Sequence, residues 1–253
     1  MSELSIAAMV FACCFGAAIA GVCLGRIIPD RHLDSDSKDT VKLVMGLIAT
    51  MAALVLSLLI ASAKNSFDAQ QTGLEQLATN VIELDHDLAA LGPETKDIRE
   101  GIRRAMIGLH DRVWSGQGAT TETIDPRAMA EFHDAMGAAI QSFPANTDTQ
   151  QYERKAAFDL ARTIAHTRLL LFVETTATIS APLLVILVLW VSTLFLGFGL
   201  FARLNPTVYG SFFVGSVCVA AAIFLILELN SPFSGLMRLS DGPVRYAISR
   251  VGQ

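Results

Sequence analysis

The chain has 253 residues, of which 17% are charged and 52% are hydrophobic, and its mean hydropathy is +0.48. A water-soluble domain of this length usually carries about 25% charged residues, so the composition argues against a soluble protein and favours a membrane protein. The net charge of −5 is mild and gives no reason to expect a nucleic-acid partner.

Four apolar stretches predict membrane spans, at residues 4–25, 43–63, 179–202 and 208–227. Each is long enough to cross a bilayer, which takes about 20 residues of helix, and none contains Asp, Glu, Lys, Arg or His. The first stretch lacks the basic residues that precede a signal peptide, so we expect it to be retained as a span. The four cysteines (Cys13, Cys14, Cys23 and Cys218) lie inside these stretches, without the spacing of a metal site or a disulfide framework.

Residues 64–178 separate the second and third spans and are charged, with 11 Lys or Arg against 17 Asp or Glu. Leucines and other apolar residues recur there with a heptad spacing, which predicts that the second span continues outward as one long helix. Gly92 and Pro93 end that helix. The heptad positions are Phe67, Leu74, Leu77, Val81, Leu84, Leu88 and Leu91.

Three further helices are predicted before the third span. One carries an apolar face from Ile98 to Val113, a second begins near Pro126 and ends near Phe143, and a third begins at Asp148 and runs into the third span. The expected fold is therefore all-α, with a helix pair at 4–63, an extramembrane helical bundle at 64–178, a second helix pair at 179–227 and a C-terminal loop and tail at 228–253.

One face of the second span is small or hydroxyl-bearing, which makes it a candidate pore lining or a helix contact face. Its residues are Gly46, Thr50, Ala53 and Ser57, spaced four, three and four apart. The larger Met51, Leu54 and Leu58 could form apolar rings that gate a pore by dewetting.

Small residues spaced four apart also occur on two other spans. These candidate helix-packing residues are Ala17, Gly21 and Gly25 on the first span and Ser211 and Gly215 on the fourth. Such spacing lets helix backbones approach closely, either within one subunit or between subunits.

Signals of catalysis are weak. The histidines (His32, His86, His110, His133 and His166) are isolated, and the sequence contains no phosphate-binding glycine loop, no GxSxG and no CxxC. We therefore expect no enzymatic activity, no cofactor and no metal.

The segment after the fourth span combines Glu228 and Asn230 with Pro232, Phe233 and Gly235. Pro232 should stop the helix, and non-helical backbone at membrane depth is tolerated only where protein or water covers it. We expect a tucked loop, with Phe233 as an apolar plug against the base of other spans and Arg238 as an interfacial anchor.

Two stretches resemble the bacterial bestrophin-like membrane family. They are HLDSDSKDTVKLVMGLIATMAALVLSLLIASAKNSFDAQ at residues 32–70 and ELNSPFSGLMRLS at residues 228–240, in which Asn230 stands where an aspartate is common. The resemblance implies a homo-oligomeric ion channel, pentameric in bestrophins proper, whose second membrane helix lines the pore. It also implies a bacterial inner-membrane location with the bundle and both termini in the cytoplasm.

Two questions stay open at this point. Bestrophins proper look like anion channels, yet the net charge of −6 on residues 64–178 would favour cations, so the ion is not assigned. The alternative function is a non-conducting membrane scaffold that docks a partner through its helical bundle. The acidic calcium clasp of some animal relatives has no clear counterpart, in keeping with the expectation of no metal.

Overall fold

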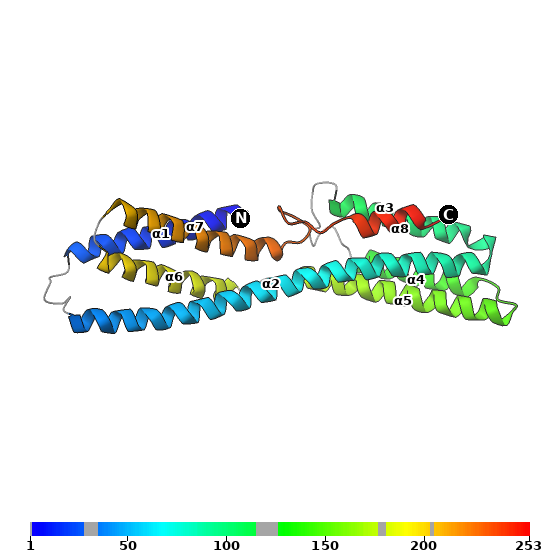
Figure 1. Ribbon diagram of the computed structural model, residues 1–253. Coiled ribbons are helices and arrows are strands. Elements are labelled where there is room, and N and C mark those ends of the chain that lie inside the picture. Colours follow the sequence, from blue (N-terminus) through cyan, green and yellow to red (C-terminus); the bar gives the residue numbers. More distant parts are fainter. Residues whose placement is uncertain (1, 28–34, 115–125, 177–180, 203–204) are drawn as a thin grey trace. The chain divides into compact units, whose positions relative to one another are not determined.

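The computed structural model describes residues 2–27, 35–114, 126–176, 181–202 and 205–253. Every regular element in these ranges is a helix, which confirms the all-α prediction (Figure 1). By their internal contacts these residues divide into two compact units. Unit 1 comprises Met1–Asn65 and Thr178–Asn230, and unit 2 comprises Ser66–Ala177 and Ser231–Gln253.

Four helices are long and apolar enough to cross a membrane, as the sequence predicts. They are α1 (Glu3–Ile27), α2 (Ser35–Leu91), α6 (Ala181–Phe201) and α7 (Pro206–Leu229). The expected first residues of the third span, 179–180, and the only basic residue between the third and fourth spans, Arg203, lie outside the described ranges. These four helices support a multi-pass membrane protein.

The helix α2 is 57 residues long and ends one residue before Gly92, which confirms that the second apolar stretch continues into the heptad region. Gly92 has a φ of 128°, a conformation that is open to glycine but strained for other residues. A short 3-10 helix, η2 (Pro93–Thr95), follows at once. The hydroxyl of Thr95 donates to the carbonyl of Leu88 over 2.6 Å and so closes the turn between α2 and the next helix.

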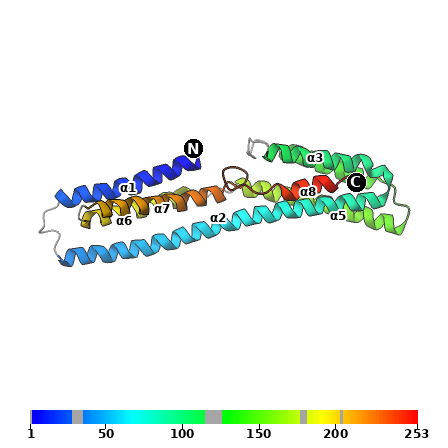
Figure 2. The ribbon, with the colours of Figure 1, turned by 45° about the horizontal axis from the view of Figure 1, so that its top comes forward.

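Unit 1 contains α1, α6, α7 and the first half of α2, and α1 runs beside both α6 and α7 (Figures 1 and 2). Its apolar centre contains Val10 and Cys14 of α1 and Ile223 of α7, with side chains of α6 packed around them. The rings of Phe11, Phe15 and Phe213 lie within 5.5–6.1 Å of one another between α1 and α7.

Unit 2 contains the second half of α2 with α3 (Lys96–Trp114), α4 (Pro126–Ser142), α5 (Asp148–Thr176) and α8 (Gly242–Arg250). The heptad leucines of α2 form its centre, since Leu77, Leu84 and Leu88 are at most 1% exposed. Ile102 and Met106 of α3, Met136 and Ile140 of α4, and Ile164 of α5 pack around them. The helices that the sequence predicts for residues 98–113, 126–143 and 148 onward are thus present, while residues 177–180, between α5 and α6, lie outside the described ranges.

The C-terminal segment differs from the expected loop and tail. Residues 242–250 form the helix α8, which packs along α3, and its Val244 and Ala247 are fully buried in the core of unit 2. Pro243 lies in the first turn of α8, where a missing N–H does no harm. Gly242 and Pro243 therefore begin a helix, and the residues after them are not an irregular tail.

Candidate functional site

The membrane segment of α2 is the least covered of the four. In its most apolar stretch 17% of the residues are buried, against 33% in α1 and in α7. The buried residues Met45, Ala52, Leu59 and Ala63 share one face of the helix. Met45 lies in the gap left by Gly197 of α6, where a Cβ atom would come within 2.6 Å of the methionine sulfur.

The candidate pore-lining residues all lie on the exposed part of this helix. Gly46, Thr50, Ala53 and Ser57 are all exposed and form one strip, away from the buried face. The hydroxyl of Thr50 donates to the carbonyl of Leu47 over 2.8 Å, so it remains able to accept a further hydrogen bond.

The larger candidates form a second exposed strip, which lies on the other side of the buried face from the first. Leu54 and Leu58 are 72% and 66% exposed, and Met51 is 43% exposed. Successive residues of an α-helix are about 100° apart, so this strip and the strip of Thr50 and Ser57 point in different directions. The structure thus separates the candidates into a small strip (Gly46, Thr50, Ala53, Ser57) and a large strip (Met51, Leu54, Leu58).

Gly21 and Gly25 lie where α1 and α6 approach most closely. A Cβ atom at Gly21 would collide with the carbonyl oxygen of Leu196, and one at Gly25 would approach the carbonyl of Leu200. A Cβ atom at Gly199 of α6 would likewise collide with the carbonyl oxygen of Ala18 of α1. These glycines act within one subunit, because both backbones belong to the same chain, and Ala17 is half-buried beside them.

The two small residues of α7 have different surroundings. Gly215 faces the ring of Phe195, which would stand 3.2 Å from a Cβ atom there. Ser211 is exposed, and its hydroxyl donates back to the carbonyl of Thr207 over 2.9 Å. Gly215 therefore packs inside unit 1, whereas Ser211 does not.

The first half of the tail motif closes α7 in unit 1. Glu228 is only 3% exposed, so its carboxyl group is inside the protein and not at a solvated edge. Asn230 caps the helix through its backbone N–H, which donates to the carbonyls of Ile226 and Leu227. The Asn230 position thus has a backbone role that does not require an aspartate.

The second half of the tail motif forms a closed loop in unit 2. The N–H of Leu239 donates to the carbonyl of Pro232 over 2.8 Å, and Gly235 supplies the bend with a φ of 79°. Phe233 packs against the core of unit 2, and its ring lies edge-on to that of Trp114 at 6.1 Å. The expectation that Phe233 plugs the base of the spans is therefore corrected, since its partners are bundle residues.

His110 and Trp114 of α3 hold this loop. The indole of Trp114 donates to the carbonyl of Leu239 over 2.9 Å, and the imidazole of His110 stacks on the indole at 5.7 Å. The Nε2 atom of His110 lies 3.1 Å from the carboxylate of Asp241. That hydrogen bond, with help from Asp111, raises the pKa of His110.

Among the other histidines that the structure describes, no comparable cluster is found. His86 and His166 are exposed, while His32 and the side chain of His133 lie outside the described residues. In the part of the chain that the structure describes, no three His, Cys, Asp or Glu side chains are grouped closely enough to hold a metal ion.

The bestrophin-like domain family matches residues 12–244, nearly the whole chain. The chain belongs to the bestrophin-like family. The match covers α1 from residue 12, the other three membrane helices, the heptad region and the tail loop, so both stretches that carried the resemblance lie inside it. No curated protein and no solved structure was found to match the chain.

Two features of this bestrophin-like chain could not be found from sequence spacing. His110 and Asp241 are 131 residues apart, and neither belongs to a recognisable motif. Asp85 and Arg99 form an ion pair with Nε–Oδ1 and Nη2–Oδ2 distances of 2.7 and 2.8 Å, and the Asp85 carboxylate also accepts from the N–H of Gly252 over 3.2 Å. The tail is therefore attached to the bundle at two places, the loop and α8.

Proposed function

We propose that this protein is a homo-oligomeric ion channel in a bacterial inner membrane, with α2 lining the pore. The observation that carries the proposal is the exposed strip on α2. Thr50 and Ser57 place hydroxyl groups on a surface of the apolar segment that α1, α6 and α7 leave uncovered. A hydroxyl group on such a face can accept a hydrogen bond from water on an axis, a partner that lipid tails do not provide.

Family membership supports the oligomer. Bestrophins proper are pentameric, and one copy of α2 cannot enclose a path for ions. The charged unit 2 would lie in the cytoplasm as an extramembrane bundle, inserted between the second and third spans.

The first experiment measures the mass of the purified particle in detergent and then its conductance in planar bilayers. We expect an oligomer and discrete channel currents. A monomer would remove the axial pathway. An intact oligomer that stays silent across salt and pH would favour the alternative, a non-conducting scaffold that binds a partner through its bundle.

A pair of variants decides which strip of α2 faces the axis. If the large strip does, Leu54→Ala widens the ring and raises the conductance; if the small strip does, Ser57→Leu blocks it and Leu54→Ala has no effect. Leu189→Ala is the matched control, because Leu189 of α6 is 62% exposed in the same unit. Equal responses of all three variants would contradict a pore lined by α2.

A further inference from the structure

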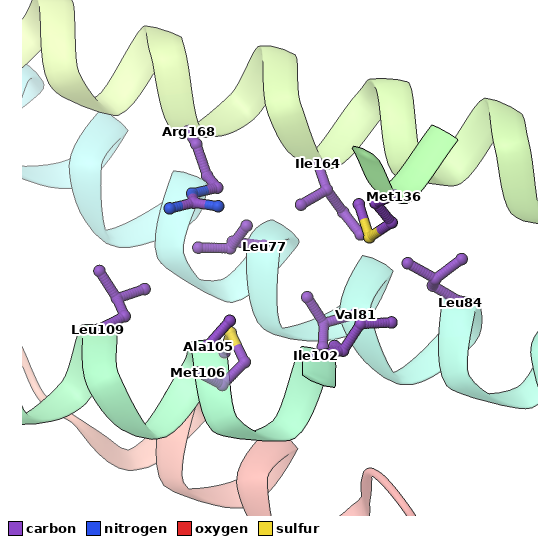
Figure 3. A pocket seen from close by; sticks show the side chains of 10 residues that line it. All are labelled: Leu77, Val81, Leu84, Ile102, Ala105, Met106, Leu109, Met136, Ile164 and Arg168. Atoms are coloured by element: carbon purple, nitrogen blue, oxygen red, sulfur yellow. The ribbon is translucent and has the colours of Figure 1, made fainter. Parts of the chain in front are cut away.

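A small cavity lies inside unit 2, between α2, α3, α4 and α5, and its volume is about 30 Å³. Figure 3 shows its lining, which is apolar except for one cation, Arg168 of α5. Arg168 and Leu109 lie toward one side of this view, and Leu84 and Met136 lie toward the other. The cavity therefore has a charged end and an apolar end.

Arg168 has no partner among the residues that the structure describes. Its guanidinium makes no hydrogen bond or ion pair there, and the charged group whose field reaches it is a second cation, Arg112. Burial, followed by this like charge, lowers the pKa of Arg168. A guanidinium has five N–H donors and no acceptor, so the site needs an acceptor from elsewhere.

Other arginines of unit 2 are satisfied by the protein. Arg99 is held by both carboxylate oxygens of Asp85 and donates to the backbone carbonyl of Gln253, and Arg154 donates to the carbonyl of Phe143. Arg168 differs because its side chain enters an apolar cavity. Arg168 is partly exposed, and withdrawing part of a charged group from water without compensating hydrogen bonds costs free energy, which an anion bound at this end would recover.

We propose that the cavity binds a short-chain monocarboxylate, with the carboxylate on Arg168 and the alkyl chain between Leu77, Met106 and Ile164. A planar carboxylate matches the fork of a guanidinium and accepts two parallel hydrogen bonds. The apolar walls provide no donors for a second charge, so a dianion would leave one charge unpaired. The volume is that of one or two water molecules, so the chain must be short, with the flexible Met106 and Met136 making way for it.

The test is thermal unfolding of the full-length protein in detergent, in sodium chloride, acetate or butyrate at one ionic strength. We expect butyrate at about ten times its dissociation constant to raise Tm by roughly 3 °C over chloride, with acetate between them. Isothermal titration with butyrate gives the affinity directly. The same Tm in chloride, acetate and butyrate would overturn the assignment.

Three variants locate the site. Arg168→Met should abolish the butyrate shift while leaving the unliganded Tm unchanged or higher, because it removes an uncompensated charge. Arg162→Met is the control, since Arg162 is exposed on the same helix and should keep the full shift. Ala105→Val fills the cavity without touching the charge and should weaken butyrate more than acetate. A shift that survives in Arg168→Met, or a lower unliganded Tm there, would refute the proposal.

This proposal does not depend on ion conduction. Its readout is binding to unit 2, so a silent but butyrate-binding oligomer would refute the channel alone. A conducting protein without a butyrate shift would refute the cavity assignment alone.

Discussion

The helices within unit 1 and the helices within unit 2 pack through different kinds of contact, although α2 contributes to both units. In unit 1, α1 and α6 meet through glycines, with Gly21 and Gly199 placing one backbone directly on the other. In unit 2 the helices meet through large side chains, with Leu84 and Leu88 fully buried. Unit 2 also contains the nearly buried ion pair of Asp85 and Arg99.

The difference fits the proposal that unit 1 lies in a membrane and unit 2 in water. In lipid, burying a leucine gains little, because the tails are as apolar as the side chain, so close backbone approach and dispersion hold the helices. In water, burying apolar surface is the main driving force, and large side chains supply it. The contrast therefore favours a membrane environment for unit 1 and an aqueous one for unit 2.

The largest expected effect comes from truncating one leucine in each half of α2. Leu84→Ala in unit 2 leaves a cavity in a fully buried position and should cost about 4 kcal/mol of unfolding free energy. Leu54→Ala in unit 1 removes a 72% exposed side chain and should cost less than about 0.5 kcal/mol. Thermal unfolding in detergent, followed by circular dichroism, compares the two. Equal losses of stability would contradict the distinction between the units.

The second effect concerns the buried charge of unit 2. Asp85→Asn leaves Arg99 partly uncompensated at 16% exposure and should cost about 3 kcal/mol. The Asp85 carboxylate hydrogen-bonds to the guanidinium and raises the pKa of Arg99. The variant loses this effect, yet Arg99 stays charged in it because arginine is not deprotonated in proteins. The control is Asp39→Asn, which removes the partner of Lys42 in an exposed pair of unit 1 and should change nothing measurable. Chemical denaturation measures the free energy of unfolding of both variants. An Asp85→Asn protein as stable as the wild type would show that the ion pair adds no stability.

The sequence predicted the parts of this architecture that depend on repetition or on length. The spans follow from runs of about 20 apolar residues, and the core of unit 2 follows from the heptad that contains Leu77 and Leu84. Such patterns can be recognised because apolar residues recur at many positions, so no single residue decides the prediction. The spacing of the sequence assigns Thr50 and Leu54 to faces of the second span. It does not predict which helices, lipids or solvent those faces contact.

The missed features depend on single residues far apart in the chain. The helix α8 has only nine residues, and its Gly-Pro start is also a loop signal, so nothing local marks Val244 as core. Chain order predicts that Phe233 packs against the spans, since they precede it, whereas in the structure Trp114 of α3 packs against it. The partly exposed Arg168 has no local signal in the sequence, because the cavity that it lines is formed by residues of α2, α3 and α4 as well as α5.

The third effect tests the glycine contacts of unit 1. Gly21→Ala places a methyl group against the carbonyl oxygen of Leu196, so the two helices must separate, at a cost of about 2 kcal/mol. Gly16→Ala is the control on the same helix, because nothing lies within 4 Å of a Cβ atom there. Alanine also has the higher helix propensity, so this control should be neutral or slightly stabilising. Unfolding in detergent measures both, and a tolerated Gly21→Ala would show that α1 and α6 are not in close contact.

The smallest effect is a pH dependence that belongs to unit 2 alone. Around His110, the charged groups are the carboxylates of Asp241 and Asp111, and Arg245 lies 3.8 Å from the Asp241 carboxylate. Folding raises the pKa of His110 above its ordinary value of 6.5, so the protonated ring favours the folded state. Its stabilisation is complete below that value and is lost as the pH rises through the higher folded pKa.

A comparison of the wild type with His110→Gln isolates this contribution, because glutamine can still donate one hydrogen bond but cannot be charged. The difference in unfolding free energy should be less than about 1 kcal/mol, since the pair is partly exposed, and should shrink as the pH rises from about 5 to about 9. Asp241→Asn should remove most of the pH dependence, because Asp241 makes the largest contribution to the raised pKa of His110. A difference that stays constant over this range would mean that His110 holds the tail loop by stacking on Trp114, and that its charge adds nothing.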